Sequence, residues 1–388
     1  LDRLDAKLTA ARVVQVRGLP GSGKSVLVRR AVQRALERGP ILFLKAEQLE
    51  GTSWISYADS QRLSGAPLEQ LLVEIGAAGT PILFIDAIDR IEKKHQPIIL
   101  DVIRVIAESP LLDNWRVVVS LRDTGIEVLR NWLGHVLDRL KVETLEVGQL
   151  SDEEAETLAK AKPHLRPLLF GSAQVQEIVR RPFFAKVLNQ SHVADASVPT
   201  FAPRSEVDLI ENWWRRGGYN ETGQSAIERQ RALLDLALIR ARQLSQPIRI
   251  SQLTSAAHID DLRSDGILQH AREGISVRFA HDIFFEWAFF YVLADRGPKW
   301  IEEIKTCGEP PAVARVVELV SQWEYAQGED WPTYLAQTEG SDLRSQWLRA
   351  WLIGPLGTAR FEADEGQFAT AVFADDFRLF RKVLVWFQ

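Results

Sequence analysis

The stretch Gly18-Leu19-Pro20-Gly21-Ser22-Gly23-Lys24-Ser25 matches the pattern G-x-x-x-x-G-K-S, which is typical of a phosphate-binding loop. A β-branched run, Val13 to Val16, precedes it and predicts a buried strand, and residues 26–36 follow with helical spacing. Strand, glycine loop and helix in this order are the context that the pattern requires. The sequence therefore predicts an α/β fold with a nucleotide site at this loop.

The loop residues have separate physical tasks. Glycines let backbone N–H groups converge on phosphate oxygens, and the start of the next helix adds a partial positive charge. Lys24 is expected to reach the β- and γ-phosphates, where it is a candidate catalytic residue, and the Ser25 hydroxyl is expected to ligate Mg²⁺. The residues expected to contact ATP or ADP here are Gly18, Pro20, Gly21, Ser22, Gly23, Lys24, Ser25 and Val26.

The composition of the chain narrows the class of protein. Its 388 residues are 46% hydrophobic and 26% charged, as in ordinary globular proteins, and the net charge of −5 does not indicate a dominant nucleic-acid surface. A single cysteine, Cys307, excludes an internal disulfide and suits a reducing, cytoplasmic location. The longest apolar run, Ile283 to Ala294, contains Glu286 and is too short to span a bilayer.

The chain begins at Leu1, only a few residues before the first predicted strand, and contains no methionine. We expect a fragment of a longer protein, with any effector and most of the sensor outside it. We also expect that methionines have been left out of the printed sequence, which would shorten some spacings by a residue.

Alternating strand-like and helix-like segments over residues 1–149 predict a parallel five-stranded sheet. The expected strands are Val13–Val16, Ile41–Leu44, Ile82–Ile85, Arg116–Leu121 and Val142–Val147, and expected helices include Leu68–Ile75, Pro97–Ala107 and Gly125–Leu140. Residues 51–65 are polar and are expected to form an irregular excursion. The rest of the chain divides into a helical domain at 150–203, a winged-helix domain at 204–296 and an all-α C-terminal region at 297–388, which is a candidate for the start of a sensor.

Local signals support this division. Ser151 and Glu154 have the spacing of a capping box, and Pro182 within a helical pattern marks a helix start or break. Residues 190–204 are expected to be a linker. Helices followed by a hairpin around Arg272-Glu273-Gly274 suggest the winged helix. The tryptophans of the last region are expected in its core: Trp300, Trp323, Trp331, Trp347, Trp351 and Trp386.

Two acids follow the third predicted strand. Asp86 ends an apolar run and is expected at the carboxyl edge of the sheet, where it can hold Mg²⁺ directly or through water. Asp89 is a candidate to orient or deprotonate the attacking water. A surface acid at a strand end and a surface ion pair are the alternatives for Asp86 and Asp89 respectively.

Arg122 follows the fourth predicted strand. If its sheet neighbours are the phosphate-loop strand and the Asp86 strand, Arg122 points toward the γ-phosphate and can sense or stabilise its charge. An exposed loop arginine is the alternative.

Together these motifs resemble the STAND class of P-loop ATPases, and within it the NACHT clade. Asp86-Ala87-Ile88-Asp89 fits the clade's pattern, but Arg90 stands where a second acid is usual, which puts fast hydrolysis in doubt. Ala87 also separates the chain from AAA+ motors, which usually place Glu after the Mg²⁺-binding Asp. The segment Ser120-Leu121-Arg122 resembles the clade's first sensor.

Two later segments extend the resemblance over residues 1–295. Arg181-Pro182-Phe183 stands where the family has a proline that packs on adenine, so Pro182 is an expected base contact; a helix N-terminal proline is the structural alternative. Residues 277–286 are similar to the family's winged-helix motif, whose histidine reaches the β-phosphate of ADP. The resemblance assigns that role to His281, and a helix-capping histidine is the alternative.

The resemblance implies an ATP/ADP-controlled switch that opens and forms homo-oligomers on activation, in immune or anti-phage defence. A conventional ATP hydrolase or motor is one alternative. An origin-recognition-like DNA-binding ATPase is the other, but the expected recognition helix at 254–264 carries Asp260 and Asp261 against a single arginine, Arg263, which disfavours phosphate contacts.

Overall fold

The structure is a computed structural model that describes the chain except for residues 64–66, 123–124, 193–200, 220, 245, 328–329, 364 and 388. Its contacts divide into two compact units, one formed by Leu1–Leu158 with Arg180–Lys186 and the other by Ala159–Val179 with Val187–Gln388. The division falls inside two helices, α7 (Asp152–Ala161) and α10 (Pro182–Gln190). Each unit is described separately below.

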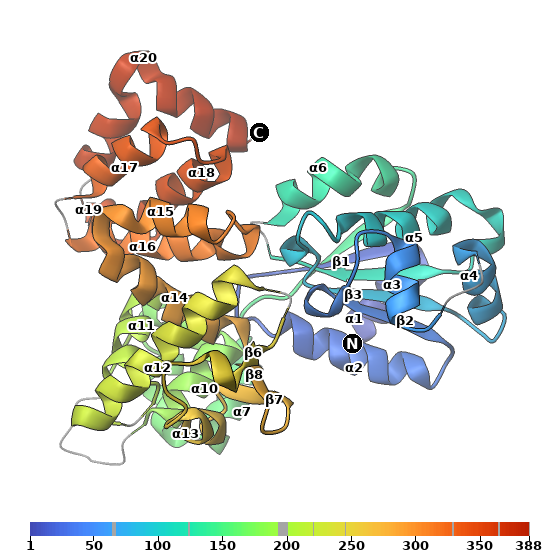
Figure 1. The fold of residues 1–388 in the computed structure, drawn as a ribbon, viewed down its shortest axis with the longest axis horizontal. Coiled ribbons are helices and arrows are strands. Elements are labelled where there is room, and N and C mark those ends of the chain that lie inside the picture. The colour runs from blue at the N-terminus through green and yellow to red at the C-terminus, as the bar shows by residue number, and fades with distance from the viewer. Residues whose placement is uncertain are drawn as a thin grey trace. The chain divides into compact units, whose positions relative to one another are not determined.

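The first unit is built on a five-stranded parallel sheet in the order β2-β3-β4-β1-β5 (Figure 1). The strands are β1 (Val13–Arg17), β2 (Ile41–Lys45), β3 (Ile82–Asp86), β4 (Arg116–Ser120) and β5 (Val142–Glu146). All five strands predicted from the sequence are present, with ends that differ by one residue. The β1 strand lies between β4 and β5, so the loop after it opens at the centre of the carboxyl edge.

Helices cover both faces of this sheet. On one face, α1 (Asp2–Ala10) and α2 (Lys24–Leu36) share a core with Val14, Phe84 and Val118. On the other face, the core contains Val13, Ile85 and Val117. The helices that pack there are α3 (Trp54–Ser60), α4 (Leu68–Gly76), α5 (Gln96–Glu108) and α6 (Ile126–Leu137). Neighbouring strand residues therefore alternate between two apolar layers, as a sheet buried on both faces requires.

The expectation of an irregular excursion at residues 51–65 is wrong for residues 54–60, whereas residues 51–53 and 61–63 lie outside helices and strands. Residues 54–60 form α3, which begins at a capping box in which the Ser53 hydroxyl accepts from the backbone of Ser56. Trp54, Tyr57 and Ala58 are buried in the core because their spacing places them on one helical face. The exposed apolar Ile55 and the polar residues that flank the helix obscure this pattern in the sequence.

The helices after the sheet begin where local signals predict. Ser151 and Glu154 form the expected capping box at the start of α7, with the Glu154 carboxylate accepting from Ser151 N at 2.9 Å. Two short helices follow, α8 (Arg166–Leu169) and α9 (Ala173–Val179). Pro182 is the first residue of α10, which agrees with a helix start. Most of the expected linker at 190–204 lies outside the described residues.

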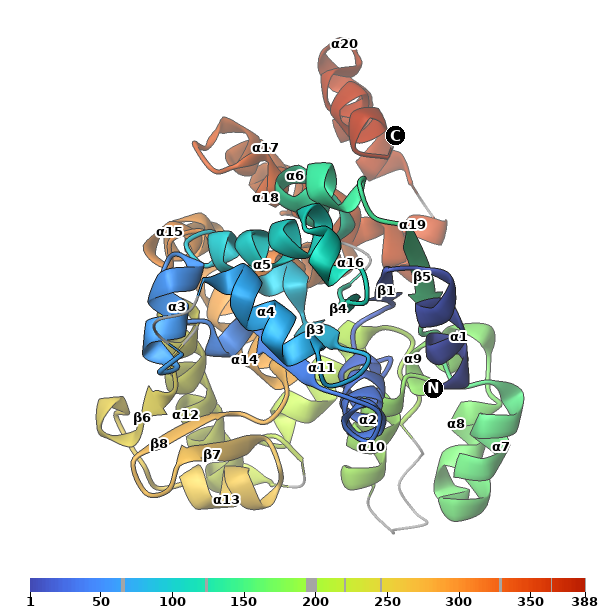
Figure 2. The same cartoon turned by 90° about the vertical axis from the view of Figure 1, so that its right-hand side faces the viewer.

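The middle of the second unit combines helices with a small antiparallel sheet. The helices are α11 (Glu206–Arg215), α12 (Gly223–Arg242), α13 (Ile259–Ser264) and α14 (Asp282–Arg296). The strands are β6 (Ile248–Arg249), β7 (Leu268–Arg272) and β8 (Ser276–Phe279), in the order β6-β8-β7 (Figure 2). The predicted hairpin is present, whereas the two-residue strand β6 was missed because so short a segment has no periodicity.

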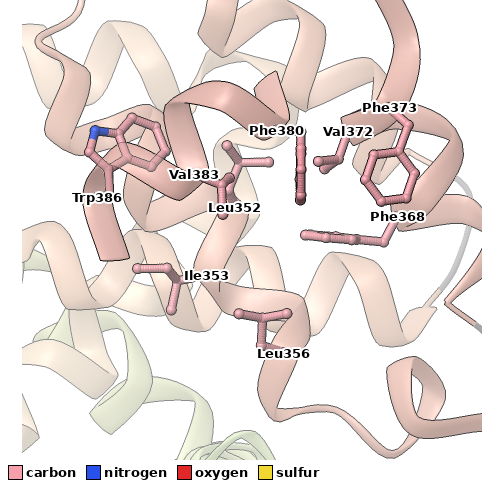
Figure 3. A pocket seen from close by; sticks show the side chains of 9 residues that line it. All are labelled: Leu352, Ile353, Leu356, Phe368, Val372, Phe373, Phe380, Val383 and Trp386. Carbon is pink, nitrogen blue, oxygen red and sulfur yellow. The ribbon is translucent and has the colours of Figure 1, made fainter. Parts of the chain in front are cut away.

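The last part of the chain is helical, as expected. Its helices are α15 (Trp300–Thr306), α16 (Ala314–Gln327), α17 (Trp331–Gly340), α18 (Ser345–Ile353), α19 (Ala359–Ala363) and α20 (Gly366–Phe387). Four of the tryptophans are fully buried, namely Trp300, Trp331, Trp347 and Trp351, and Trp323 and Trp386 are half-buried. Trp386 lines an apolar cavity of about 120 Å³ together with Leu352, Phe373 and Phe380 (Figure 3).

Short 3-10 helices connect several of these elements, at Ala46–Gln48, Ile88–Arg90, Pro110–Leu112, Pro163–Leu165, Ile250–Gln252, Gly297–Lys299, Pro311–Val313 and Gly354–Gly357. Within the described part of the chain, no helix is long and apolar enough to cross a membrane.

Candidate nucleotide-binding site

The loop between β1 and α2 has a shape that only glycine permits at three positions. Gly21 and Gly23 have φ of 78° and 96°, in the left-handed region that side chains disfavour. A Cβ on Gly18 would lie 2.3 Å from the carbonyl oxygen of Val147, on the segment after β5. The sequence pattern is thus a steric requirement of this loop, which lies at the N-terminus of α2, the end of a helix that attracts anions.

Two polar side chains of the loop are positioned for phosphate. The Lys24 ammonium donates to the carbonyl oxygens of Gly18 at 2.7 Å and Leu19 at 2.9 Å, so it curls back over the loop. The Ser22 hydroxyl is buried and has no hydrogen-bond partner among the described residues. A buried hydroxyl without a partner carries a desolvation penalty that a phosphate oxygen would relieve. The Val26 side chain, next along α2, is 56% exposed.

Asp86, Ser25 and Ser120 meet at the ends of β3, α2 and β4. The Ser25 hydroxyl lies 3.3 Å from Asp86 Oδ1, and the Ser120 hydroxyl donates to the same oxygen. Ser120 also accepts from the backbone N–H of Ala87 at 2.8 Å, which holds the turn after Asp86. This role of Ser120 cannot be predicted from the sequence, because Ser120 contacts Asp86 only through the pairing of β3 with β4.

These oxygens fit a magnesium ion. No group of three or more His, Cys, Asp or Glu among the described residues is arranged to hold a metal. Mg²⁺ does not need such a cage, because it is usually held by one or two protein oxygens with water and phosphate oxygens completing its coordination. A hydroxyl and a carboxylate oxygen 3.3 Å apart, from Ser25 and Asp86, match that requirement.

Asp89 lies in the 3-10 turn after β3 and is the buried acid of the site. Loss of hydration raises the pKa of its carboxyl, while the positive charges of Arg122, Arg90 and Lys24 act in the opposite direction. Its Oδ1 atom is buried and has no hydrogen-bond partner in the described structure. A carboxyl of this kind is suited to accept a proton once water or phosphate reaches it.

Arg122 and Gly125 lie beside Asp89 on the segment after β4. Arg122 is half-buried and close enough for its charge to act on the pKa of Asp89. A Cβ on Gly125 would meet the Asp89 Cβ at 2.3 Å, so only glycine allows this approach. The structure therefore brings together the predicted site residues Lys24, Ser25, Asp86, Asp89 and Arg122, and adds Ser120 and Gly125 to them.

The start of α10 also contacts the phosphate loop. The backbone N–H of Phe183, which follows Pro182, donates to the carbonyl oxygen of Gly21 at 3.2 Å. Arg181 is buried and its guanidinium lies 5.4 Å from the centre of the Phe184 ring. Pro182 is consequently held within one residue of a direct loop contact, although its packing on adenine stays a prediction.

His281 belongs to the second unit, where it caps α14. Its Nδ1 atom accepts from Ile283 N at 3.2 Å. Because Nδ1 is the acceptor, the neutral ring carries its proton on Nε2 and presents a donor there. The capping alternative is therefore present, and a contact of His281 with phosphate stays a prediction.

Comparisons with known proteins do not assign a family. No family model matches the chain, and no curated protein matches it. Among solved structures, it is similar to a Walker-type ATPase of Pyrococcus abyssi, with 12% identity, 74% of this chain and 94% of that chain covered, and a TM-score of 0.36.

Two other solved structures are comparably similar. The ORC1 protein of Aeropyrum pernix in complex with DNA has 14% identity, 72% and 86% coverage of the two chains and a TM-score of 0.35. A RuvB variant of Thermotoga maritima has 16% identity, 71% and 90% coverage and a TM-score of 0.29. Likeness at this level assigns no activity or partner, so the functional argument rests on the chain itself. Its loop, sheet order and Asp86 are those of a P-loop nucleotide-binding domain.

Proposed function

We propose that the chain is an ATP/ADP-controlled switch of the NACHT type. It binds nucleotide and Mg²⁺ at the phosphate loop, hydrolyses ATP slowly, and forms homo-oligomers when ATP replaces ADP, in immune or anti-phage signalling in the cytoplasm. The region from α11 to α14 is, in this proposal, a winged helix that closes over ADP through His281.

The observation that carries the proposal is the bond from Phe183 N to Gly21 O. It joins the phosphate loop to α10, and α10 continues from the first compact unit into the second. A helix that begins on the nucleotide loop and ends in another unit can transmit a change at the loop as a rigid element. Nucleotides that differ in their contacts with the loop would then favour different arrangements of the units.

Slow turnover is supported by the acids of the site. Ala87 follows Asp86, so no glutamate stands beside the magnesium ligand, and Asp89 is a desolvated acid whose pKa is raised. Burial favours the protonated form of this carboxyl, which cannot act as a base, whereas the charges of Arg122 and Lys24 favour the ionised form, which can. A switch needs a long-lived bound state, whereas a motor needs rapid release of product.

The test is the identity of the nucleotide that the purified protein carries, measured by denaturation and ion-exchange chromatography. We expect stoichiometric ADP, little or none in Lys24→Ala, and a reduced amount in His281→Ala. A His281→Asn variant keeps a capping side chain and separates the capping role from the phosphate role. Rapid steady-state ATP turnover in a protein that carries no nucleotide, unaffected by His281→Ala, would contradict the switch and favour a conventional hydrolase.

A second candidate function is an origin-recognition-like ATPase that binds DNA. The observation on this chain that favours it is the presence of three arginines without described carboxylate partners, Arg249, Arg272 and Arg278, on the small antiparallel sheet.

A further inference from the structure

The β6-β8-β7 sheet has one apolar and one basic face. Arg249 on β6 and Arg272 on β7 both pair with Ser276 on the central strand, and Arg278 lies two residues further along that strand. Paired residues point to the same side of an antiparallel sheet, as do residues two apart. An irregularity in β7 between His270 and Arg272 brings Arg272 opposite Ser276, so the three arginines share one face. The opposite face is buried and contains Ile248, Leu268, Val277 and Phe279.

The three arginines, which we call the arginine face, have no counter-charge in the described structure. Arg249 and Arg272 are exposed, and Arg278 is half-buried with an Nε atom that has no hydrogen-bond partner. No described carboxylate, including Glu273 on the adjoining turn, forms an ion pair with any of them. By contrast, Arg263 on α13 pairs with Asp260 at 3.1 Å. The positive charge of the arginine face is therefore available to a ligand.

Sheet geometry sets the spacing of these charges. Arg249 and Arg272 lie on the two outer strands, which are about 10 Å apart across β8. Arg278 lies on β8, about 7 Å along the strand from Ser276, the residue that pairs with both of them. Arginines at this spacing, together with the exposed Gln269 on the same face, suit a ligand that carries a regular series of phosphates.

The types of side chain on the arginine face distinguish between classes of ligand. Protein partners usually need a central apolar or aromatic anchor, and unpaired nucleic-acid strands need aromatic side chains on which bases stack. The accessible side chains that the pairing places on this face are arginine and glutamine, and Ser276 between them is buried. Ile275, which is 47% exposed, lies on the hairpin turn and not on the face. A polar, flat surface of this kind fits the backbone of a duplex.

We propose that the arginine face, Arg249, Arg272 and Arg278, binds the phosphate backbone of double-stranded DNA. The α13 helix does not make this contact, because Asp260 and Asp261 in its first turn would repel phosphates. Binding is independent of base sequence, since guanidinium contacts to phosphates position a duplex without reading it. The inference deepens the second candidate function and does not require the nucleotide switch.

The test is fluorescence anisotropy of a labelled duplex of about 25 base pairs over a range of salt concentrations. Three phosphate contacts predict a slope of log K against log salt of about −2.7, and each Arg→Gln variant should bring it closer to zero by about 0.9. At 0.1 M salt, one contact corresponds to about an eightfold change in affinity, so the triple variant should bind roughly 500-fold more weakly.

Arg263→Gln is the matched control, because it removes an exposed arginine of the same region that already has a carboxylate partner. We expect it to bind the duplex like the unaltered protein, and we expect all variants to unfold at the same temperature and to carry the same nucleotide. A triple variant that binds as tightly as the unaltered protein overturns the inference. So does equal competition by a single strand of the same length. Lys24→Ala, which tests the switch alone, should still bind DNA.

Discussion

At the scale of single residues, Asp86 is held by hydroxyl groups that come from two other elements. Ser120 donates to Asp86 Oδ1 and is almost fully buried, while Ser25 approaches the same oxygen from the start of α2. A buried hydroxyl that orients a metal-binding carboxylate typically changes metal affinity by 10- to 100-fold when it is removed.

We therefore expect Ser120→Ala to weaken Mg²⁺-dependent ATP binding by about tenfold or more. Binding of ADP without magnesium should change little, because the phosphate loop itself is unaltered. Titration calorimetry with and without Mg²⁺ measures both quantities. Ser120→Thr keeps the hydroxyl and serves as the control; an equal loss in both variants would show that the role of Ser120 is packing.

Substitution of Asp89 is predicted to change the rate of ATP hydrolysis and the stability of the fold in opposite directions. Its folded-state pKa is raised above the unfolded value because burial penalises the charged form. The folded state then binds the proton more strongly than the unfolded state, so this group makes the protein less stable as pH rises between the two pKa values. Near neutral pH, burial of this carboxyl therefore lowers the free energy of unfolding.

Asp89→Asn should accordingly reduce single-turnover ATP hydrolysis by about 100-fold while leaving ATP affinity nearly unchanged. Its melting temperature should match or exceed that of the unaltered protein at pH 7.5, and the advantage should shrink toward pH 4, where the aspartate is protonated. If Asp89→Asn hydrolyses ATP at the normal rate, Asp89 takes no part in the reaction. A melting temperature that falls equally at both pH values would contradict the electrostatic argument.

The sequence predicts part of this site for a physical reason. Asp86 follows four apolar residues, and a strand that ends in an acid places that acid at the carboxyl edge. Ser120 and Gly125 could not be assigned in the same way, because their roles depend on which strands are neighbours and on a close approach to Asp89. Such contacts join segments that are more than 30 residues apart, and no local pattern records them.

At the scale of elements, predictability follows the length and periodicity of each segment. The five parallel strands are apolar runs bounded by turns, so each was found within a residue of its observed ends. The α3 helix was missed because only Trp54, Tyr57 and Ala58 of its residues are buried, and polar residues dominate its surroundings. The hairpin of β7 and β8 was found from its glycine turn, whereas the arginine face appears only when β6 is placed beside β8.

The contact between α12 and α13 gives a pH-dependent prediction at this scale. His258 lies 3.1 Å from Glu228 on α12 and 3.1 Å from Asp261 on α13. Hydrogen bonding to Glu228, assisted by Asp261, raises the pKa of His258 above its ordinary value of 6.5. A raised pKa means that this stabilisation is fully present below the unfolded-state pKa and is lost as pH rises through the folded-state pKa.

His258→Gln should therefore lower the free energy of unfolding at pH 5.5 and have little effect at pH 8.5. Chemical denaturation at the two pH values measures the difference. Glu228→Gln removes the main partner of the histidine and should show the same pH dependence. A loss of stability that is equal at both pH values would show that the ion pair does not hold the two helices together.

At the scale of the whole molecule, the division into two units predicts two unfolding transitions. The nucleotide site lies in the first unit, so ADP should raise the transition of that unit by mass action. The second unit contains its own buried charge network, in which Arg315 on α16 pairs with Glu206 on α11 and with Glu286 on α14 at 3.1 Å. Trp287 Nε1 donates to Glu206 at 3.0 Å.

Loss of the guanidinium would leave two buried carboxylates without their counter-charge, since Glu206 is 5% exposed and Glu286 is fully buried. Removing one partner of a buried ion pair typically costs about 3–5 kcal/mol. For a unit of this size, that corresponds to a fall in melting temperature of roughly 10 °C. We expect Arg315→Leu to produce this fall in the transition that ADP does not raise directly.

Differential scanning calorimetry with and without ADP measures both transitions in one experiment. Arg296→Leu is the matched control, because Arg296 is exposed and lies 3.5 Å from its carboxylate partner Glu303, so its loss should cost less than about 1 kcal/mol. If α10 couples the units, ADP should also raise the second transition of the unaltered protein. If ADP does not change the temperature of the second transition, the proposal that α10 transmits the state of the nucleotide site is contradicted, although the site itself is not.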